Sequence, residues 1–309
     1  MQTKAVYRVR NWRQYNQSLI NRGNLTIWLD DATISAWNSV TRTGRRGRIP
    51  TFSNMAIECA LTLRGLIGLP LRQTQGFIEG LFSVLKLSVD APSYSTMSRR
   101  ASTLNVAIPR IRQSGPINIL IDASGLKVFG EGEWKCRIHG KDKRRTWRKI
   151  HIGIDRESQE IVAVTLTASN VHDSMETANL LAQIDAVATV TGDKGYDNRN
   201  AYCPIAGKGA KAIIPPRSGA ALKLKSPTWG DVERNRLVRE SHLLGKDAWK
   251  TGSGYTKRVL VETCFSRYKK IIGPALHSRN LANQKTEVRI GAKIINTMTH
   301  LGMPESYKV

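Results

Sequence analysis

The pattern of apolar residues changes character near residue 117. Residues 51–69 and 71–85 place apolar side chains at the spacing of buried helices. Residues 117–128, 147–155 and 161–167 instead contain the continuous or alternating apolar runs that are typical of strands. The same patterns predict the elements that follow, namely a helix over 173–184, strands over 188–192 and 211–215, and helices over 255–269 and 286–301.

This order of elements predicts an α/β fold. Three strands, a helix, a strand, a helix, a strand and a final helix follow one another as in a ribonuclease-H-like mixed sheet with helices on both faces. We expect this domain to occupy residues 113–309, with a small polar insert at about 218–252. Residues 1–112 then form a separate, mainly helical N-terminal region.

The chain is strongly basic, with 48 Lys and Arg residues against 24 Asp and Glu residues and a formal net charge of +24. The excess extends over both regions, so nucleic acid is the expected partner, and charge that serves solubility alone is the alternative. No apolar run is long enough for a membrane span, and the start, MQTKAVYRVRNW, lacks the apolar stretch of a signal peptide. The four cysteines form no paired motif, which argues against a zinc site or a disulfide framework. An intracellular nucleic-acid-binding protein without a membrane partner is expected.

The N-terminal region contains a helix-turn-helix pattern at about 71–104. An apolar helix is followed by the turn SVDAPS and by a second segment, YSTMSRRASTL, which is rich in Ser, Thr and Arg. We expect this region to bind DNA, although any corner between two helices gives a similar pattern. The second helix would present four polar side chains to DNA, namely Ser95, Ser98, Arg99 and Arg100.

A basic arm precedes these helices. The segment TRTGRRGRIP over residues 41–50 places Arg45 and Arg46 among glycines. Such an arm suits the minor groove or the phosphate backbone of DNA, and a solvated loop is the alternative interpretation.

Three carboxylates are the candidates for catalysis. Asp122 lies inside an apolar run, where a charge is costly unless it is paired or bound to a metal ion. Asp193 ends the fourth predicted strand, and Glu262 lies on a late helix. If the first and fourth strands are neighbours, Asp122 and Asp193 lie side by side, and the helix places Glu262 over them. Two Mg²⁺ ions about 4 Å apart would relieve the repulsion and could promote phosphodiester chemistry.

The late helix also carries a regular set of polar residues. Tyr255, Arg258, Glu262 and Lys269 are three, four and seven residues apart, so Arg258, Glu262 and Lys269 share one helix face, with Tyr255 at its start. A surface helix with ordinary charge pairs would show similar spacing. The other side is expected to pack on the core through its apolar residues Val259, Leu260, Cys264 and Phe265.

With these residues in place, the chain resembles the DDE transposases of bacterial insertion sequences, in the insertion-sequence 5 and 4 group. The signature Tyr, two residues, Arg, three residues, Glu, six residues, Lys matches at every interval, and LIDASGLKVFGEGEW and VTGDKGYD resemble the two aspartate motifs. The resemblance implies a catalytic triad of Asp122, Asp193 and Glu262 that depends on two Mg²⁺ ions, with Mn²⁺ able to substitute. It also implies DNA contacts from the Tyr, Arg and Lys of the signature.

The resemblance further implies a reaction and its partners. Such an enzyme binds the terminal inverted repeats of its element, cuts the 3′ ends and joins them to target DNA, as at least a homodimer, in the cytoplasm and nucleoid of a bacterium. Some relatives stack an extruded base on an inserted tryptophan, a role that Trp229 would take here; a loop anchor is the alternative.

Two other functions use the same sequence features. A ribonuclease-H-like nuclease would cut DNA without strand transfer. A DNA-binding regulator would have lost a carboxylate, whereas this chain retains all three.

We interpret three other aspartates as structural, namely Asp155 at a strand end, Asp173 at a helix cap and Asp197 in a turn.

Overall fold

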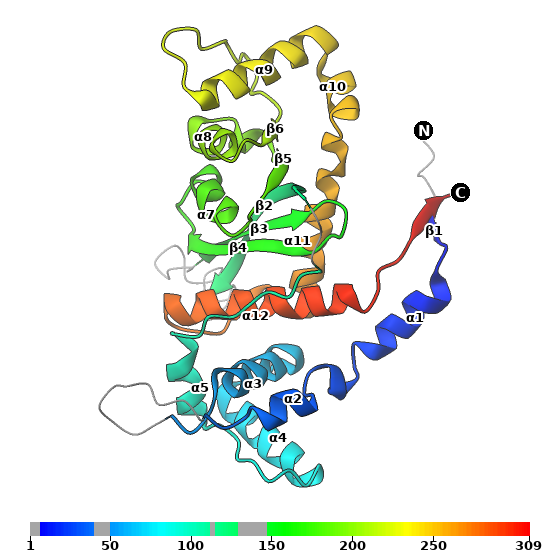
Figure 1. The fold of residues 1–309 in the computed structure, drawn as a ribbon, viewed down its shortest axis with the longest axis vertical. Helices are drawn as coiled ribbons and strands as arrows, with labels where there is room; N and C mark the ends of the chain where they lie inside the picture. The colour runs from blue at the N-terminus through cyan, green and yellow to red at the C-terminus, as the bar shows by residue number, and fades with distance from the viewer. Residues whose placement is uncertain (1–6, 40–49, 112–114, 129–146) are drawn as a thin grey trace, which may run out of the picture. The chain divides into compact units, whose positions relative to one another are not determined.

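The computed structural model describes residues 7–39, 50–111, 115–128 and 147–309 (Figure 1). The chain forms two compact units. The first contains residues 1–109 and 293–309, and the second contains residues 110–292.

The first unit is mainly helical. Helices α3, α4 and α5 pack on one another around buried apolar side chains that include Trp37, Ile78 and Met97. The final strand β8 pairs antiparallel with β1, so the last residues, which we predicted to lie in the catalytic domain, join this unit instead. Its elements are β1 (Tyr7–Val9), α1 (Trp12–Asn21), η1 (Leu25–Ile27), α2 (Asp31–Ser35), α3 (Asn54–Ile67), α4 (Leu71–Val84), α5 (Tyr94–Ala101) and β8 (Ser306–Lys308).

Local capping explains where these helices begin. The Ser53 hydroxyl accepts a hydrogen bond from the backbone N–H of Ala56, and Ser93 caps α5 in the same way. The connection between α4 and α5 covers residues 85–93, which is longer than the predicted turn. It is held to the core because Trp37 Nε1 donates to the carbonyl of Asp90 at 2.8 Å.

The second unit is built on a mixed sheet with the strand order β4-β3-β2-β5-β6, with β7 also pairing with β2. β2 is antiparallel to β3 and parallel to β5, which confirms the predicted adjacency of the first and fourth strands. The sheet therefore has the ribonuclease-H-like arrangement that the order of elements predicted. Its strands are β2 (Ile117–Val128), β3 (Trp147–Asp155), β4 (Ile161–Ala168), β5 (Val187–Thr191), β6 (Lys211–Ile213) and β7 (Ala275–Leu276).

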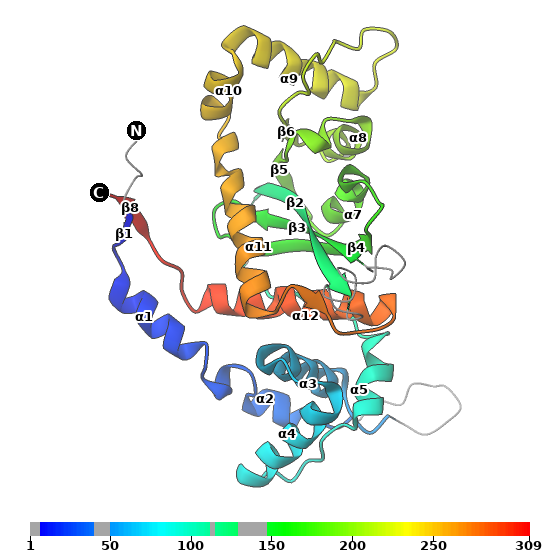
Figure 2. The ribbon, with the colours of Figure 1, turned by 180° about the vertical axis from the view of Figure 1, so that it is seen from behind.

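Helices cover both faces of this sheet, with α7 and α8 on one face and α11 on the other (Figures 1 and 2). Because side chains alternate along β2, Ile119 and Ile121 enter the core beneath α7 and α8. Asp122 and Ser124 face the opposite side, where α11 lies. The helical elements are η2 (Asp173–Glu176), α7 (Thr177–Leu181), η3 (Lys194–Tyr196), α8 (Arg199–Gly207), α9 (Trp229–Leu244), α10 (Lys246–Gly252), η4 (Tyr255–Arg258), α11 (Val259–Ile271) and α12 (Leu281–His300).

Three sequence predictions need correction. The insert, whose polar sequence shows no obvious core, forms the helices α9 and α10 and buries Leu237 and Trp249. The helix predicted at 255–269 begins with one 3₁₀ turn. Val259, which was expected to pack on the core, is 54% exposed, because the buried stripe of α11 begins at Val261. That stripe consists of Val261, Cys264, Phe265 and Tyr268. The predicted cap at Asp173 is His172 instead, whose ring accepts from the N–H of Ser174.

A close approach between α11 and α12 makes Gly291 a position of large expected effect on stability. A Cβ at Gly291 would lie 2.5 Å from Tyr268 Oη and 2.7 Å from its Cε2, and Tyr268 is 2% exposed. We expect Gly291→Ala to lower the free energy of unfolding by about 1–3 kcal/mol, because the ring has no space to move into. Gly80→Ala is the control, since nothing lies within 4 Å of a Cβ there. Denaturant unfolding measures both, and equal stability would contradict the packing described.

Candidate active site

Strand pairing brings the first two predicted carboxylates to one level of the sheet. In the parallel pair of β2 and β5, Leu120 lies opposite Thr191. Two residues further along the chain are Asp122, still within β2, and Asp193, which follows Gly192 after the end of β5. Asp193 is the N-cap of η3, and its Oδ1 accepts a hydrogen bond of 2.8 Å from the N–H of Gly195. This cap fixes the orientation of the Asp193 side chain.

Arg258 connects two of the three carboxylates. Its Nη1 donates to Asp122 Oδ2 at 2.9 Å, and its Nη2 donates to Glu262 Oε1. The Asp122 and Arg258 side chains are about one-fifth exposed, whereas that of Glu262 is 51% exposed. The predicted signature residues therefore do meet over the sheet, with the guanidinium between Asp122 and Glu262.

The remaining signature residues lie around this ion pair. Lys269 Nζ donates to Ser124 Oγ at 2.7 Å. The half-buried ring of Tyr255 packs against Trp249, with ring centroids 6.1 Å apart. Burial raises the pKa of the Tyr255 phenol, opposed by Arg258 and reinforced by Asp193 and Asp122, so it remains a proton donor at neutral pH.

The pKa of Asp122 is set mainly by burial, with a smaller effect from like charges. Burial raises the pKa of the Asp122 carboxyl above its usual range, and the nearby carboxylates Asp193 and Glu262 reinforce that shift. The N–H of Ala123 and the guanidinium of Arg258 oppose it but do not cancel it. Asp122 is therefore a carboxylate whose negative charge is under-compensated, and an additional cation would stabilise it.

The donor set fits a hard divalent cation. Such ions prefer carboxylate oxygens, and three carboxylates, of which Asp122 and Asp193 are partly buried, are a typical environment for them. Among the residues that the structure describes, no three His, Cys, Asp or Glu side chains are already gathered as a metal-binding group. The guanidinium of Arg258, between Asp122 and Glu262, supplies the positive charge at this position instead.

Two family profiles, both described as a transposase DDE domain, match this chain at residues 20–131 and 113–297. The second match covers more than half of the chain and contains all three carboxylates. The chain belongs to the DDE transposase family. It is therefore a metal-dependent transposase, and the site described above contains the three acidic residues that we assigned to the family triad.

Two solved structures of transposases are similar to this one at low sequence identity. One is the piggyBac transposase synaptic complex with hairpin DNA, at 8% identity over 91% of this chain and 73% of that chain, with a TM-score of 0.38. The other is the Drosophila P element transposase strand transfer complex, at 11% identity over 94% and 85% of the two chains, with a TM-score of 0.30. The family assignment rests on the domain matches and not on these distant similarities.

The other predicted DNA contacts of the transposase differ in their surroundings. On α5, Ser95 and Arg99 are exposed and Ser98 is half-buried. Arg100 is held within the protein, since it donates to the carbonyl of Phe52 at 2.9 Å and to Asn54 Oδ1 at 2.6 Å. Arg45 and Arg46 lie outside the described residues.

Trp229 is not a loop anchor. It is the first residue of α9, and 83% of its surface is exposed.

In the parts of the chain that the structure describes, no helix is long and apolar enough to cross a membrane.

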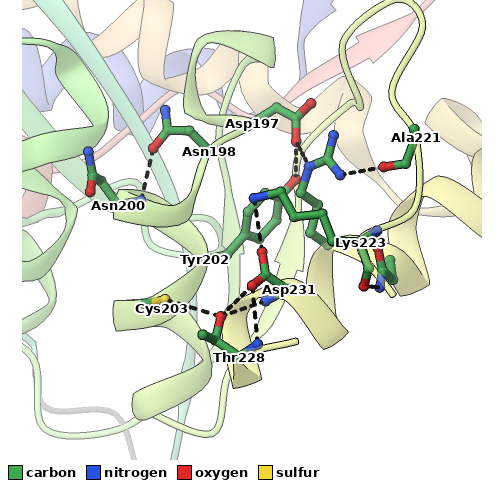
Figure 3. A network of polar contacts seen from close by, with 11 residues as sticks. Asp197, Asn198, Asn200, Tyr202, Cys203, Ala221, Lys223, Thr228 and Asp231 are labelled. Atoms are coloured by element: carbon green, nitrogen blue, oxygen red, sulfur yellow. Dashed lines mark hydrogen bonds and ion pairs between the residues drawn. The ribbon is translucent and has the colours of Figure 1, made fainter. Parts of the chain in front are cut away.

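Two features near the site were missed by sequence reasoning. Ser124 holds Lys269, and strand alternation could have revealed it, because Ser124 follows Asp122 by two residues. Asp197, interpreted from sequence as a turn residue, is a fully buried carboxylate that binds Arg234 of α9 (Figure 3). No sequence signal links these two residues, since their pairing depends on how α9 packs on α8.

Proposed function

We propose that this transposase belongs to an insertion sequence of the 5 and 4 group, whose terminal inverted repeats it binds. It would cut the 3′ ends with water and then transfer them to target DNA. The observation that carries this proposal is the meeting of Asp122, Arg258 and Glu262, beside Asp193, on the face of the sheet beneath α11. Asp122 lies on β2 and Asp193 caps η3, while Arg258 and Glu262, on η4 and α11, match the spacing of the signature.

In this proposal Asp122, Asp193 and Glu262 hold two Mg²⁺ ions, for which Mn²⁺ can substitute. Such ions make an oxygen nucleophile more reactive and stabilise the departing oxygen of a phosphodiester. Arg258 would transfer one or both of its contacts from carboxylates to a DNA phosphate, for which its planar fork is suited. Lys269 would bind a second phosphate, and the protonated phenol of Tyr255 would donate to a third.

The DNA partner follows from the same site and from the net charge of +24. Two element ends must be joined in one event, so we propose that a homodimer forms in the working complex. A protein with this charge is also expected to associate with the nucleoid.

The first unit is proposed to bind the inverted repeats through α4 and α5. We expect Arg99→Ala to weaken binding to end DNA and to reduce the slope of log affinity against log salt concentration by about one, since one phosphate contact is lost. Arg100→Ala is the comparison, because Arg100 is bound within the protein, and it should mainly reduce thermal stability. Fluorescence anisotropy across a salt series measures both variants, and an unchanged slope for Arg99→Ala would contradict the role of this residue.

Trp229 is proposed to stack on a DNA base, since its indole is exposed at the start of α9. With 2-aminopurine at the end of the transferred strand, the wild-type protein should quench the fluorescence, because stacking on an indole does so, whereas Trp229→Ala should not. Leu243→Ala, at a position 86% exposed on the same helix, is the control. Equal fluorescence with both variants would remove Trp229 from the proposal.

One experiment separates the transposase from its rivals. A duplex that ends at the cut 3′-OH of the element is mixed with supercoiled plasmid and Mg²⁺, and the products are analysed for covalent joining. Joined products are expected. Nicking of the plasmid without joining would favour the nuclease, and binding without either reaction would favour the regulator.

A further inference from the structure

We infer that Asp197 and Arg234 are positioning residues that hold the loop carrying Asp193 by fastening it to helix α9. The inference rests on the proposed function in one respect, namely that it takes Asp193 as a metal-binding carboxylate. Its structural basis is a set of polar contacts next to the sheet (Figure 3).

The Asp197 carboxylate is the centre of these contacts, with its side chain 0% exposed. Oδ1 accepts from Arg234 Nε at 2.9 Å and from the Tyr202 hydroxyl at 3.1 Å. Oδ2 accepts from the backbone N–H of Arg217 at 2.8 Å. Partners that follow Asp197 by 5, 20 and 37 residues therefore meet at this one carboxylate.

The same contacts reach back to Asp193. Arg217 Nε and Nη2 lie 3.5 and 3.4 Å from the carbonyls of Lys194 and Gly195, the two residues after Asp193. Asn198 Nδ2 also donates to the carbonyl of Gly195, at 3.2 Å. The N–H of Gly195 belongs to the same peptide group as the carbonyl of Lys194, and it donates to Asp193 Oδ1. A shift of this peptide group would therefore disturb the Asp193 carboxylate directly.

Helix α9 provides the fixed support for this loop. Arg234 Nη1 donates to the carbonyl of Ala221 at 2.9 Å, while its Nε holds Asp197. The N-terminus of α9 lies so close to α8 that a Cβ at Gly230 would be 2.8 Å from both the backbone N and the Sγ of Cys203. Thr228 and Asp231 close a capping box at this end, so α9 begins at a defined point.

The continuation of this segment reaches the other half of the site. Helix α10 follows α9, and its Trp249, 3% exposed, packs against the ring of Tyr255. Tyr255 begins the segment that carries Arg258 and Glu262. The α9–α10 segment thus contacts both parts of the chain that carry catalytic carboxylates, Asp193 through Arg234 and Glu262 through Trp249. Partners that orient metal-binding side chains typically change metal affinity or activity by about 10–100-fold when they are lost.

Hydrogen–deuterium exchange on the metal-free protein tests this inference without relying on catalysis. Arg234→Ala should speed exchange of the peptide covering residues 193–198 by about tenfold, because the loop loses its attachment and opens more often. Arg239→Ala, an exposed arginine on the same helix, is the matched control and should leave this exchange unchanged. Arg234→Lys should give an intermediate rate, since lysine keeps the charge but lacks the planar fork with which Arg234 contacts Asp197 and Ala221 through separate nitrogens.

A second measurement follows Mn²⁺ binding by electron paramagnetic resonance. Arg234→Ala and Asp197→Asn should raise the Mn²⁺ dissociation constant by about tenfold, while affinity for end DNA without metal stays within about twofold. Unchanged exchange in folded Arg234→Ala would overturn the inference. If that variant does not fold, Arg234→Lys and Asp197→Asn decide the point by the same exchange measurement. A wild-type protein that cleaves no DNA would overturn the proposed function instead, and the exchange result would still decide the role of Arg234.

Discussion

Asp122→Asn is expected to reduce the rate of metal-dependent DNA cleavage by at least about 10³-fold without destabilising the protein. The amide keeps the shape of the side chain and can still accept from Arg258, but it lacks the negative charge that a divalent ion requires. Cleavage of a duplex that carries an element end, measured in Mg²⁺ and in Mn²⁺, gives the loss of activity. Asp247→Asn is the control, since that side chain is 97% exposed on α10.

The stability of the same variant has a predictable pH dependence in the absence of metal. Burial, together with Asp193 and Glu262, raises the pKa of Asp122 in the folded protein, so its ionisation there costs more than in the unfolded chain. Wild-type stability is therefore reduced as the pH rises through that raised pKa, and the uncharged variant avoids the reduction. The melting temperature of the variant relative to wild type should increase from acidic to neutral pH. A relative decrease over this range would show that Arg258 over-compensates the charge.

Arg258→Gln is expected to reduce cleavage by about 100-fold, because a preorganised positive charge beside the reacting phosphate is lost. It should also destabilise the metal-free protein, since Asp122 and Glu262 lose their shared partner. Arg258 lowers the pKa of Asp122, so without it that pKa rises further, and the destabilisation should grow as the pH increases and Asp122 ionises.

Single-turnover cleavage and thermal melting across a pH series measure these effects. Lys257→Gln removes a neighbouring exposed charge from the same 3₁₀ turn and serves as the control. If Arg258→Gln and Lys257→Gln reduce cleavage equally, general attraction of DNA and not the specific position of Arg258 would explain the loss.

The sheet and the meeting of the three candidate carboxylates on it could be predicted from sequence for definite physical reasons. The apolar run of residues 117–128 defines a central strand, and a carboxylate within it is conspicuous because burying a charge is costly. The intervals from Tyr255 to Lys269 place the polar signature on one side of a helix. Each of these signals is local in the sequence, and the strand forms where it was predicted, while the helix is preceded by a 3₁₀ turn.

Other features could not be predicted because they depend on distant parts of the chain. Strand β8 joins the first unit through pairing with β1, at the opposite end of the sequence. Helix α9 was hidden because polar residues such as Asp231 and Asn235 occupy part of its buried face, where they bind the capping Thr228 and the backbone of Lys223. Sequence spacing showed that Arg258 and Glu262 share a face, but not that Arg258 also reaches Asp122.

The most direct test of the account is DNA cleavage by wild type and Glu262→Gln on a supercoiled plasmid that carries the element ends. We expect new 3′-OH ends at the element boundary with wild-type protein in Mg²⁺, none when the metal is chelated, and none with Glu262→Gln at equal DNA affinity. Equal cleavage by wild type and Glu262→Gln would contradict it, because the third carboxylate would then have no part in the chemistry.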